Sequence, residues 1–300
     1  MFKAVTLSLW LSIFLLSISF AAEPATDLTV GEGFTNPIGF HDPTPTFSWK
    51  LPAGVEKQTA YQITLARGLE RWDSGWIESE QSVRVPWTGQ PFESREGGCW
   101  KVRYRDQDGN ESDWSDFARF TMGLQSKDDW QAKWIRPKES SDPKQEPVAW
   151  LRKKFTVDAA GHGSAHLYVT ARGMFDVKLN GIRVSDDYFA NGWTSYNNRI
   201  DTLTYKVHRL IKQGENTIEV ALGKGWYGGR LVAKGNYAVY GADPEALVQL
   251  EIALPEGKKQ VVVSDETWEG TWTGPIKSSS IYDGEHYDAT QPITDWQPVV

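Results

Sequence analysis

The chain has 300 residues, 40% of them hydrophobic, which is enough for about two domains of ordinary size. Its formal charge of -7 is spread without long runs of one sign, and this excludes a basic surface for nucleic acid or for an anionic membrane. The single cysteine, Cys99, excludes an intramolecular disulfide and a cluster of thiolate metal ligands. Because Cys99 stands in a strand-like run with Trp100 and Val102, we expect a buried, unreactive thiol.

The first residues have the composition of a secretory signal. Lys3 supplies the positive charge, residues 7–20 form the apolar stretch, and Ser19 and Ala21 are the small residues expected before a cleavage site. We therefore expect a signal peptide over residues 1–21, cleaved after Ala21 or Ala22, and a mature chain that is secreted, periplasmic or extracellular. The apolar run is short for a membrane span, and no later stretch is suitable, so we expect no span after cleavage.

Residues 26–123 are predicted to form a first domain of short strands separated by turns. The candidate strands are 47–50, 60–66, 82–85, 99–105 and 117–122. Ser112-Asp113-Trp114-Ser115, just before the last strand, resembles the end of an immunoglobulin-like or fibronectin type III domain. No catalytic group of residues is apparent in this domain.

A polar linker is expected over 124–146, and a second domain over 147–298. Its central stretch is 174–230, where Phe175, Val177 and Leu179 alternate with polar residues as in a half-buried strand. Asn180-Gly181 predicts a type I′ hairpin, since both central residues of that turn need positive φ. A turn is expected at 214–216 and a short helix at 206–212. The predicted class is all-β: an immunoglobulin/fibronectin III-like sandwich followed by a jelly-roll β-sandwich.

The second domain resembles the N-terminal β-sandwich of bacterial α-L-rhamnosidases, and the first resembles the immunoglobulin-like domain that commonly precedes it. The motifs that carry the resemblance are Leu179-Asn180-Gly181, Gly192-Trp193-Thr194-Ser195-Tyr196, Thr204-Tyr205, Gly214-Glu215-Asn216, Gly225-Trp226-Tyr227 and Tyr282-Asp283-Gly284-Glu285. It covers roughly residues 130–296, and its specificity comes from the set of spaced motifs rather than from any single one.

The resemblance implies that this chain is a region of an α-L-rhamnosidase that carries no catalytic residues. Such enzymes are inverting hydrolases whose two carboxylates sit in a downstream (α/α)6 barrel, and no barrel is present in these 300 residues. In some members the equivalent sandwich is a calcium-dependent rhamnose-binding module. The expected partners are therefore a rhamnose-containing glycan or glycoside and a catalytic barrel of the same or a longer chain. No cofactor is expected to be required, and calcium is the one candidate ion.

Two loops of the second domain are candidates for a carbohydrate site. Trp193, Tyr196, Trp226 and Tyr227 are suited to stack on a pyranose, and planar amide or guanidinium groups are suited to bind its hydroxyls. The predicted carbohydrate-binding residues are Asn191, Trp193, Tyr196, Asn197, Trp226, Tyr227 and Arg230. The alternative is that these rings pack the core and anchor loops, as most of the fifteen tryptophans are expected to do. We expect one of the two loop tryptophans to be exposed and the other buried.

Acidic residues offer two further candidate sites. Asp186 and Asp187, beside an asparagine oxygen, are hard ligands suited to calcium, or alternatively ordinary turn residues after a strand. Asp283 and Glu285 have the i, i+2 spacing that places two carboxylates on one side of a strand, or alternatively they form a structural turn.

Three functions follow from these observations. The first is the non-catalytic N-terminal part of a secreted α-L-rhamnosidase that binds or orients a rhamnose-containing substrate. The second is a self-sufficient hydrolase that uses Asp187, Asp283 or Glu285. The third is a stand-alone carbohydrate-binding, adhesion or structural β-sandwich protein.

Overall fold

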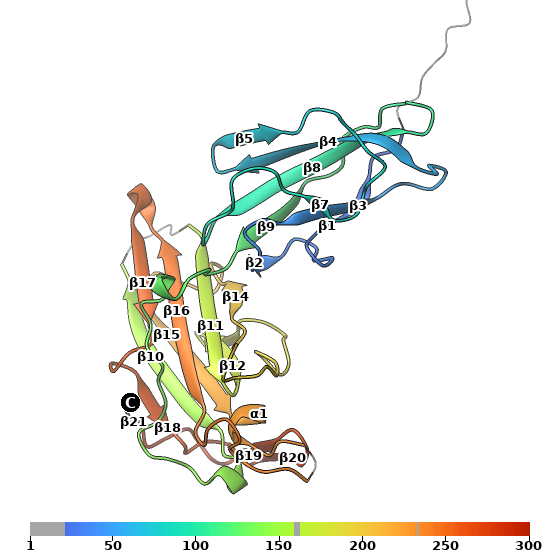
Figure 1. The fold of residues 1–300 in the computed structure, drawn as a ribbon. Helices are drawn as coiled ribbons and strands as arrows, with labels where there is room; N and C mark the ends of the chain where they lie inside the picture. Colours follow the sequence, from blue (N-terminus) through green and yellow to red (C-terminus); the bar gives the residue numbers. More distant parts are fainter. Residues whose placement is uncertain (1–21, 159–162, 233) are drawn as a thin grey trace, which may run out of the picture. The chain divides into compact units, whose positions relative to one another are not determined.

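The protein is described from a computed structural model that covers residues 22–158, 163–232 and 234–300. The predicted signal peptide, residues 1–21, lies outside the described residues. Strands dominate throughout (Figure 1), which confirms the predicted all-β class. Among the described residues, no helix has the length and apolar character needed to cross a membrane.

The chain forms two compact units, each described here by itself. Unit 1 runs through Thr35 and also contains Pro45–Gly89 and Gly98–Arg119. Unit 2 contains Asn36–Thr44, Gln90–Gly97 and Phe120–Val300. Two short segments that precede residue 98 in the sequence thus belong to unit 2.

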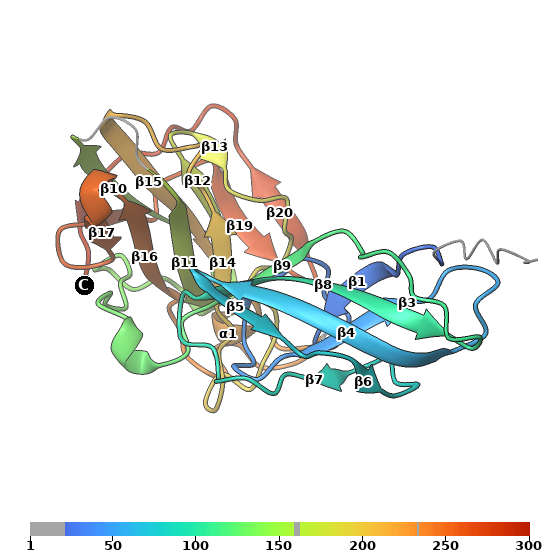
Figure 2. The same cartoon turned by 90° about the horizontal axis from the view of Figure 1, so that it is seen from above.

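Unit 1 is built from two antiparallel groups of strands, which Figure 2 shows from above. The first group, in spatial order, is β1 (Thr26–Val30), β3 (Thr46–Lys50) and β7 (Val85–Pro86). The second contains β4 (Gln58–Arg67), with β5 (Glu70–Asp73) and β6 (Ile77–Glu78) on one edge and β8 (Gly97–Asp106) on the other. The strand β9 (Ala118–Met122) begins in unit 1 and belongs to unit 2 from Phe120 onward. The strand predicted at 82–85 is shifted to β7.

Buried and half-buried side chains alternate along β8, because successive residues point to opposite faces of its sheet. Trp100, Val102 and Tyr104 are fully buried, whereas the residues between them are half-buried on the outer face. Cys99 lies on that outer face, so the expectation of a buried thiol is wrong. The predicted Ser112–Ser115 segment runs beside β8: the hydroxyls of Ser112 and Ser115 accept hydrogen bonds from the amides of Tyr104 and Val102, both at 3.0 Å.

Unit 2 is a two-sheet sandwich. Within the described residues one sheet has six strands, in the order β13 (Ile182–Arg183), β12 (Met174–Leu179), β15 (Gly214–Gly223), β10 (Ala149–Val157), β18 (Glu269–Thr271) and β21 (Gln297–Pro298). The other has four: β14 (Leu203–Lys206), β11 (Ala165–Arg172), β16 (Glu245–Ala253) and β17 (Lys259–Val263). Their inward side chains form one apolar core, with Ile218, Val220 and Leu222 of β15 fully buried in it.

Smaller elements complete unit 2. They are the β19 (Ile276–Ser280) and β20 (Gly284–Tyr287) hairpin, the helix α1 (Gly225–Gly228), the parallel partner of β9, β2 (Ile38–Phe40), and the 3-10 turns η1 (Lys127–Asp129), η2 (Pro143–Gln145) and η3 (Pro255–Gly257). Figure 1 shows α1 and the β19–β20 hairpin at the same end of the sandwich.

Local turn chemistry was predictable, but the short helix was not. Asn180 and Gly181 have φ of 53° and 80° and join β12 to β13, as the predicted hairpin requires. Residues 206–212 are not helical. They form a turn, and this turn, not one face of a helix, places the side chains of Val207 and Ile211 in the core. The predicted turn at 214–216 is already part of β15, where the Asn216 amide is buried and accepts a hydrogen bond from Asn180 at 2.8 Å.

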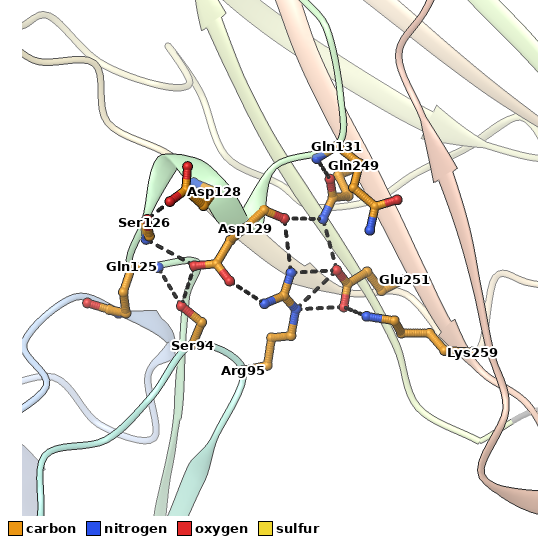
Figure 3. A network of polar contacts seen from close by, with 10 residues as sticks. All are labelled: Ser94, Arg95, Gln125, Ser126, Asp128, Asp129, Gln131, Gln249, Glu251 and Lys259. Atoms are coloured by element: carbon orange, nitrogen blue, oxygen red, sulfur yellow. Dashed lines mark hydrogen bonds and ion pairs between the residues drawn. The ribbon is translucent and has the colours of Figure 1, made fainter.

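The guanidinium group of Arg95 binds two carboxylates of unit 2, the buried one of Glu251 and the partly buried one of Asp129 (Figure 3). Arg95 donates from Nε and Nη2 to the two oxygens of Glu251, both at 2.8 Å, and from Nη1 to Asp129 at 2.6 Å. The Glu251 side chain is 7% exposed and that of Arg95 29% exposed. A bidentate contact of this kind is among the strongest hydrogen-bonded ion pairs in proteins.

One further cation, Lys259, lies 3.3 Å from Glu251, and neutral side chains supply the other contacts. Ser94 donates to Asp129 at 2.6 Å, and Gln249 donates both to Glu251 at 2.8 Å and to the carbonyl of Asp129 at 3.0 Å. Burial acts to raise the pKa of Glu251, but hydrogen bonds from Arg95 and Gln249 outweigh it and lower that pKa. Burial likewise opposes the hydrogen bonds from Ser94 and Arg95 at Asp129, and the pKa of Asp129 is also lowered.

The substitution Arg95→Met is expected to destabilise unit 2 by about 3 kcal/mol at pH 7. It removes the cation from the partly buried Asp129 and leaves the buried Glu251 with only its longer ion pair to Lys259, at 3.3 Å. Carboxylates with lowered pKa stabilise the fold above their unfolded pKa values, about 4, and lose this contribution on acidification. The deficit of the variant should therefore shrink toward pH 3. Urea denaturation at both pH values measures it.

Lys258→Met is the matched control, since Lys258 pairs with Glu256 at 2.9 Å with both side chains largely exposed. It should leave the denaturation midpoint nearly unchanged. An equal loss for Arg95→Met at pH 7 and pH 3 would contradict the electrostatic explanation.

Candidate functional site

Backbone geometry at the end of β15 positions one of the two predicted loops. The chain turns into α1 at Gly225, which has φ of 49° and whose added Cβ would lie 2.7 Å from Cγ of Met174 on β12. Only glycine is suited to both conditions. Trp226 and Tyr227 therefore project from a helix held against the edge of the sheet.

The second predicted loop brings its tryptophan onto this helix. The rings of Trp193 and Trp226 stack at 5.8 Å with an interplanar angle of 11°, and Phe189 contacts Trp226 at 6.1 Å. Trp193 is 51% exposed, whereas Trp226 is half-buried. The expectation of one exposed and one buried tryptophan is thus met only for Trp193, because stacking leaves Trp226 partly accessible. We call Phe189, Trp193 and Trp226 the aromatic platform.

Tyrosines fix the loop beneath the aromatic platform. Tyr196 packs edge-on against Tyr227 at 5.4 Å and Tyr240 at 5.2 Å, and its hydroxyl donates to the carbonyl of Gly192 at 3.0 Å. Burial raises the pKa of Tyr196 to about 12. Tyr196 and Tyr227 are therefore supports of the loop that carries Trp193.

A buried amide follows in the same loop. Asn191 is 6% exposed, and neither its side-chain oxygen nor its nitrogen has a hydrogen-bond partner among the described residues. Buried polar groups of this kind are almost always paired, with protein, water or ligand. Asn197, by contrast, is exposed.

Arg230 makes its contacts with a different group of residues. Its Nη2 donates to Asp283 at 2.6 Å and its guanidinium lies 5.4 Å from the Tyr282 ring, while its backbone amide donates to the buried carboxylate of Glu146 at 3.0 Å. The Nε atom is buried and has no partner in the described part of the chain. Asp283 is thus an ion-pair partner, and Glu285 lies exposed on β20.

The predicted metal ligands form an incomplete set. Asp186 and Asp187 are both exposed, and one oxygen of Asp187 accepts a hydrogen bond from the Tyr205 hydroxyl at 2.9 Å. The described residues contain no group of three or more His, Cys, Asp or Glu side chains arranged to hold a metal ion. Calcium prefers six to eight oxygen ligands, so two neighbouring carboxylates do not by themselves fit it.

One residue that sequence reasoning missed is a buried cation. Lys224 is fully buried at the start of α1, where its ammonium donates to the carbonyl of Ala242 at 2.9 Å and lies 3.9 Å from Asp243. Burial lowers the pKa of Lys224, although Asp243 opposes this effect. Only a lysine within a glycine-rich stretch was visible in the sequence, and the partners are about 20 residues away.

The comparisons with known proteins cover both units. Residues 162–300 match the α-L-rhamnosidase N-terminal domain, and residues 25–126 match the Rha78A-like N-terminal immunoglobulin domain. An α-L-rhamnosidase of Formosa agariphila is 43% identical over 292 residues, and one of Alteromonas sp. (strain LOR) is 39% identical over 288. These matches cover 91% and 90% of this chain but 31% of each relative, so the chain spans about a third of their length.

Solved structures agree with this result. The crystal structure of an α-L-rhamnosidase from Aspergillus terreus matches 92% of this chain and 34% of its own, with a TM-score of 0.84 and 33% identity. That of Dictyoglumus thermophilum matches 94% and 34%, with a TM-score of 0.83 and 29% identity. Fold and matches together define a region of a glycosidase. The chain has the N-terminal region of an α-L-rhamnosidase, made of the immunoglobulin-like domain and the β-sandwich domain.

Tyr196→Phe is expected to lower the free energy of unfolding by about 1 kcal/mol, because it removes one hydrogen bond from a buried hydroxyl to the Gly192 carbonyl. It should also speed amide exchange in residues 189–196. Hydrogen exchange read by mass spectrometry measures the local effect. Tyr188→Phe is the control, since Tyr188 is 80% exposed; if both variants exchange alike, Tyr196 does not support this loop.

Proposed function

We propose that the chain is the non-catalytic part of a secreted α-L-rhamnosidase and that unit 2 binds rhamnose-containing glycans at the aromatic platform. The observation that carries this proposal is the stack of Trp193 on Trp226, with half of the outer tryptophan exposed. The apolar C–H face of a pyranose suits such a ring, and the second tryptophan holds the first in place.

Asn191 supplies polar recognition in this proposal. Its amide is buried two residues before Trp193 and both polar atoms are unpaired within the described residues. A planar amide offers one acceptor and two donors, which match vicinal sugar hydroxyls. Binding would therefore remove the cost of an unpaired buried amide as well as cover the ring.

The catalytic work is assigned to a barrel beyond these residues. Two of the three carboxylates considered for a self-sufficient hydrolase have structural partners: Asp187 accepts a hydrogen bond from Tyr205, and Asp283 pairs with Arg230. The third, Glu285, is exposed on β20. The relatives are α-L-rhamnosidases of roughly three times the matched length. The proposed role of the chain is thus to hold substrate for chemistry performed elsewhere.

The first test is a calorimetric titration with L-rhamnose. Trp193→Ala should weaken binding about tenfold, which corresponds to the loss of roughly 1.4 kcal/mol of ring contact. The control is Trp296→Ala, because Trp296 also belongs to unit 2 but lies 4.0 Å beneath the Arg152 guanidinium. No heat for the unaltered chain, or equal losses in both variants, would overturn the proposal.

Calcium is tested by the same titration. A run with added calcium and one with a chelator should give the same affinity if Asp186 and Asp187 serve only as turn residues. Binding that appears with calcium alone would instead assign these two carboxylates, completed by other oxygens, to a metal-assisted site.

Secretion is the remaining part of the proposal and rests on residues 1–21. Expression of the full chain in a Gram-negative host should yield periplasmic protein whose amino terminus is Ala22 or Glu23. Amino-terminal sequencing measures this directly. Uncleaved protein in the cytoplasmic fraction would contradict it.

A further inference from the structure

Unit 1 has a ladder of alternating cations and aromatic rings on the outer face of β8. Arg105 and Arg103 lie 4.1 and 4.7 Å from the Trp76 ring, and Arg103 also lies 4.9 Å from Trp114. Lys101 then lies 4.6 Å from Trp114 and 5.2 Å from Phe117. The ladder therefore ends at Lys101 and Phe117.

Carboxylates neutralise this ladder at one end only. Glu111 pairs with Arg105 at 2.9 Å and with Arg103 at 3.4 Å, and Glu78 pairs with Arg105 at 3.6 Å. The contacts of Lys101 with described residues are the two rings, without an ion pair. No described carboxylate therefore neutralises the positive charge of Lys101 at this end of the ladder.

A pocket of about 280 Å³ adjoins this open end. On the same sheet face, Thr64 lies between Asp73 and Lys101, and Ala66 lies between Arg71 and Cys99, as the strand registers give. The two small side chains of β4 form the floor, and the longer ones of β5 and β8 form the walls. Its volume is near the lower end for ligand pockets, about 300–1,000 Å³, which suits one small ligand.

The lining of the pocket has the chemistry of an anion site with an apolar side. Arg71 donates from Nη1 to the carbonyls of Gly68 and Glu70, with no ion pair to a described residue, so its other N–H groups are available. Phe117 is 61% exposed and offers a ring. Asp73 uses one oxygen for Gln62 at 2.7 Å and Gly75 at 2.8 Å, which leaves the other to accept a hydroxyl.

We propose that this pocket of unit 1 binds an anionic sugar unit. Its carboxylate or sulfate contacts Lys101 and Arg71, its C–H face lies on Phe117, and Asp73 accepts a hydroxyl. The choice of a sugar as the carrier of the anion rests on the proposed function of the chain, whereas the anion and the ring contact rest on the pocket itself. The pocket would let unit 1 hold acidic residues of a glycan while unit 2 holds rhamnose.

Cys99 provides a direct readout, because it lines the pocket and is the chain's single cysteine. The rate at which iodoacetamide alkylates it is measured on the mature chain with sodium D-glucuronate, D-glucose 6-sulfate or neutral D-glucose, at constant ionic strength. We expect saturable slowing, at least about fivefold, by an anionic probe and little by glucose. Protection by glucuronate alone indicates a carboxylate site, by the sulfate alone a sulfate site, and by both a shared anion site.

Variants separate the pocket from a general effect of salt. Lys101→Met should abolish protection by removing the charge, and Ala66→Leu should abolish it by filling the floor without changing any charge. Lys57→Met is the control, since Lys57 pairs with Glu80 on the surface of unit 1 and should leave protection intact. Protection that persists in both pocket variants, equal protection by glucose, or none by either anion in the unaltered chain would overturn the proposal.

Failure of this proposal is distinguishable from failure of the rhamnose site. Trp193 belongs to unit 2, so Trp193→Ala should reduce the heat of rhamnose binding. The protection of Cys99 from alkylation should stay unchanged. Rhamnose binding without Cys99 protection removes only the anion pocket. Cys99 protection without rhamnose binding removes only the role of the aromatic platform.

Discussion

The strand β15 is hydrogen-bonded on both edges, to β10 along nine residue pairs and to β12 along six. Its inward side chains occupy the centre of the core of unit 2, so the register of this strand sets the register of its neighbours. It also fixes where the chain leaves the sheet. Because β15 ends at Gly223 beside Met174, the following turn at Gly225 delivers Trp226 to one place, and the geometry of the aromatic platform follows from strand pairing.

Sequence reasoning succeeded where the determinant was local. The Asn180-Gly181 hairpin follows from the φ preferences of two adjacent residues, and the alternation in residues 174–179 follows from burial of one sheet face. It failed at 206–212, where apolar spacing typical of a helix instead serves a turn packed on the sandwich. Tertiary burial there overrides local propensity.

The candidate site shows the same division. That Trp193 and Trp226 lie in glycine-rich loops could be seen in the sequence, but their stacking depends on two loops more than 30 residues apart. The partners of Arg230 are Glu146, 84 residues before it, and Asp283, 53 residues after it. Residue spacing in the sequence could not reveal these contacts, so it could not test the prediction that Arg230 binds carbohydrate. The unpaired amide of Asn191 is likewise a property of packing, which no pattern of residue types records.

The Arg95 network has a consequence for how these domains are inherited. Arg95 lies within the segment that matches the immunoglobulin-like family, yet its carboxylate partners Asp129 and Glu251 lie outside that match. A gene rearrangement that transferred only the second family domain to a new protein would carry Glu251 without its guanidinium. Exchange between genes should therefore favour transfer of both domains together, and a lineage that lost the first domain would need compensating changes at position 251.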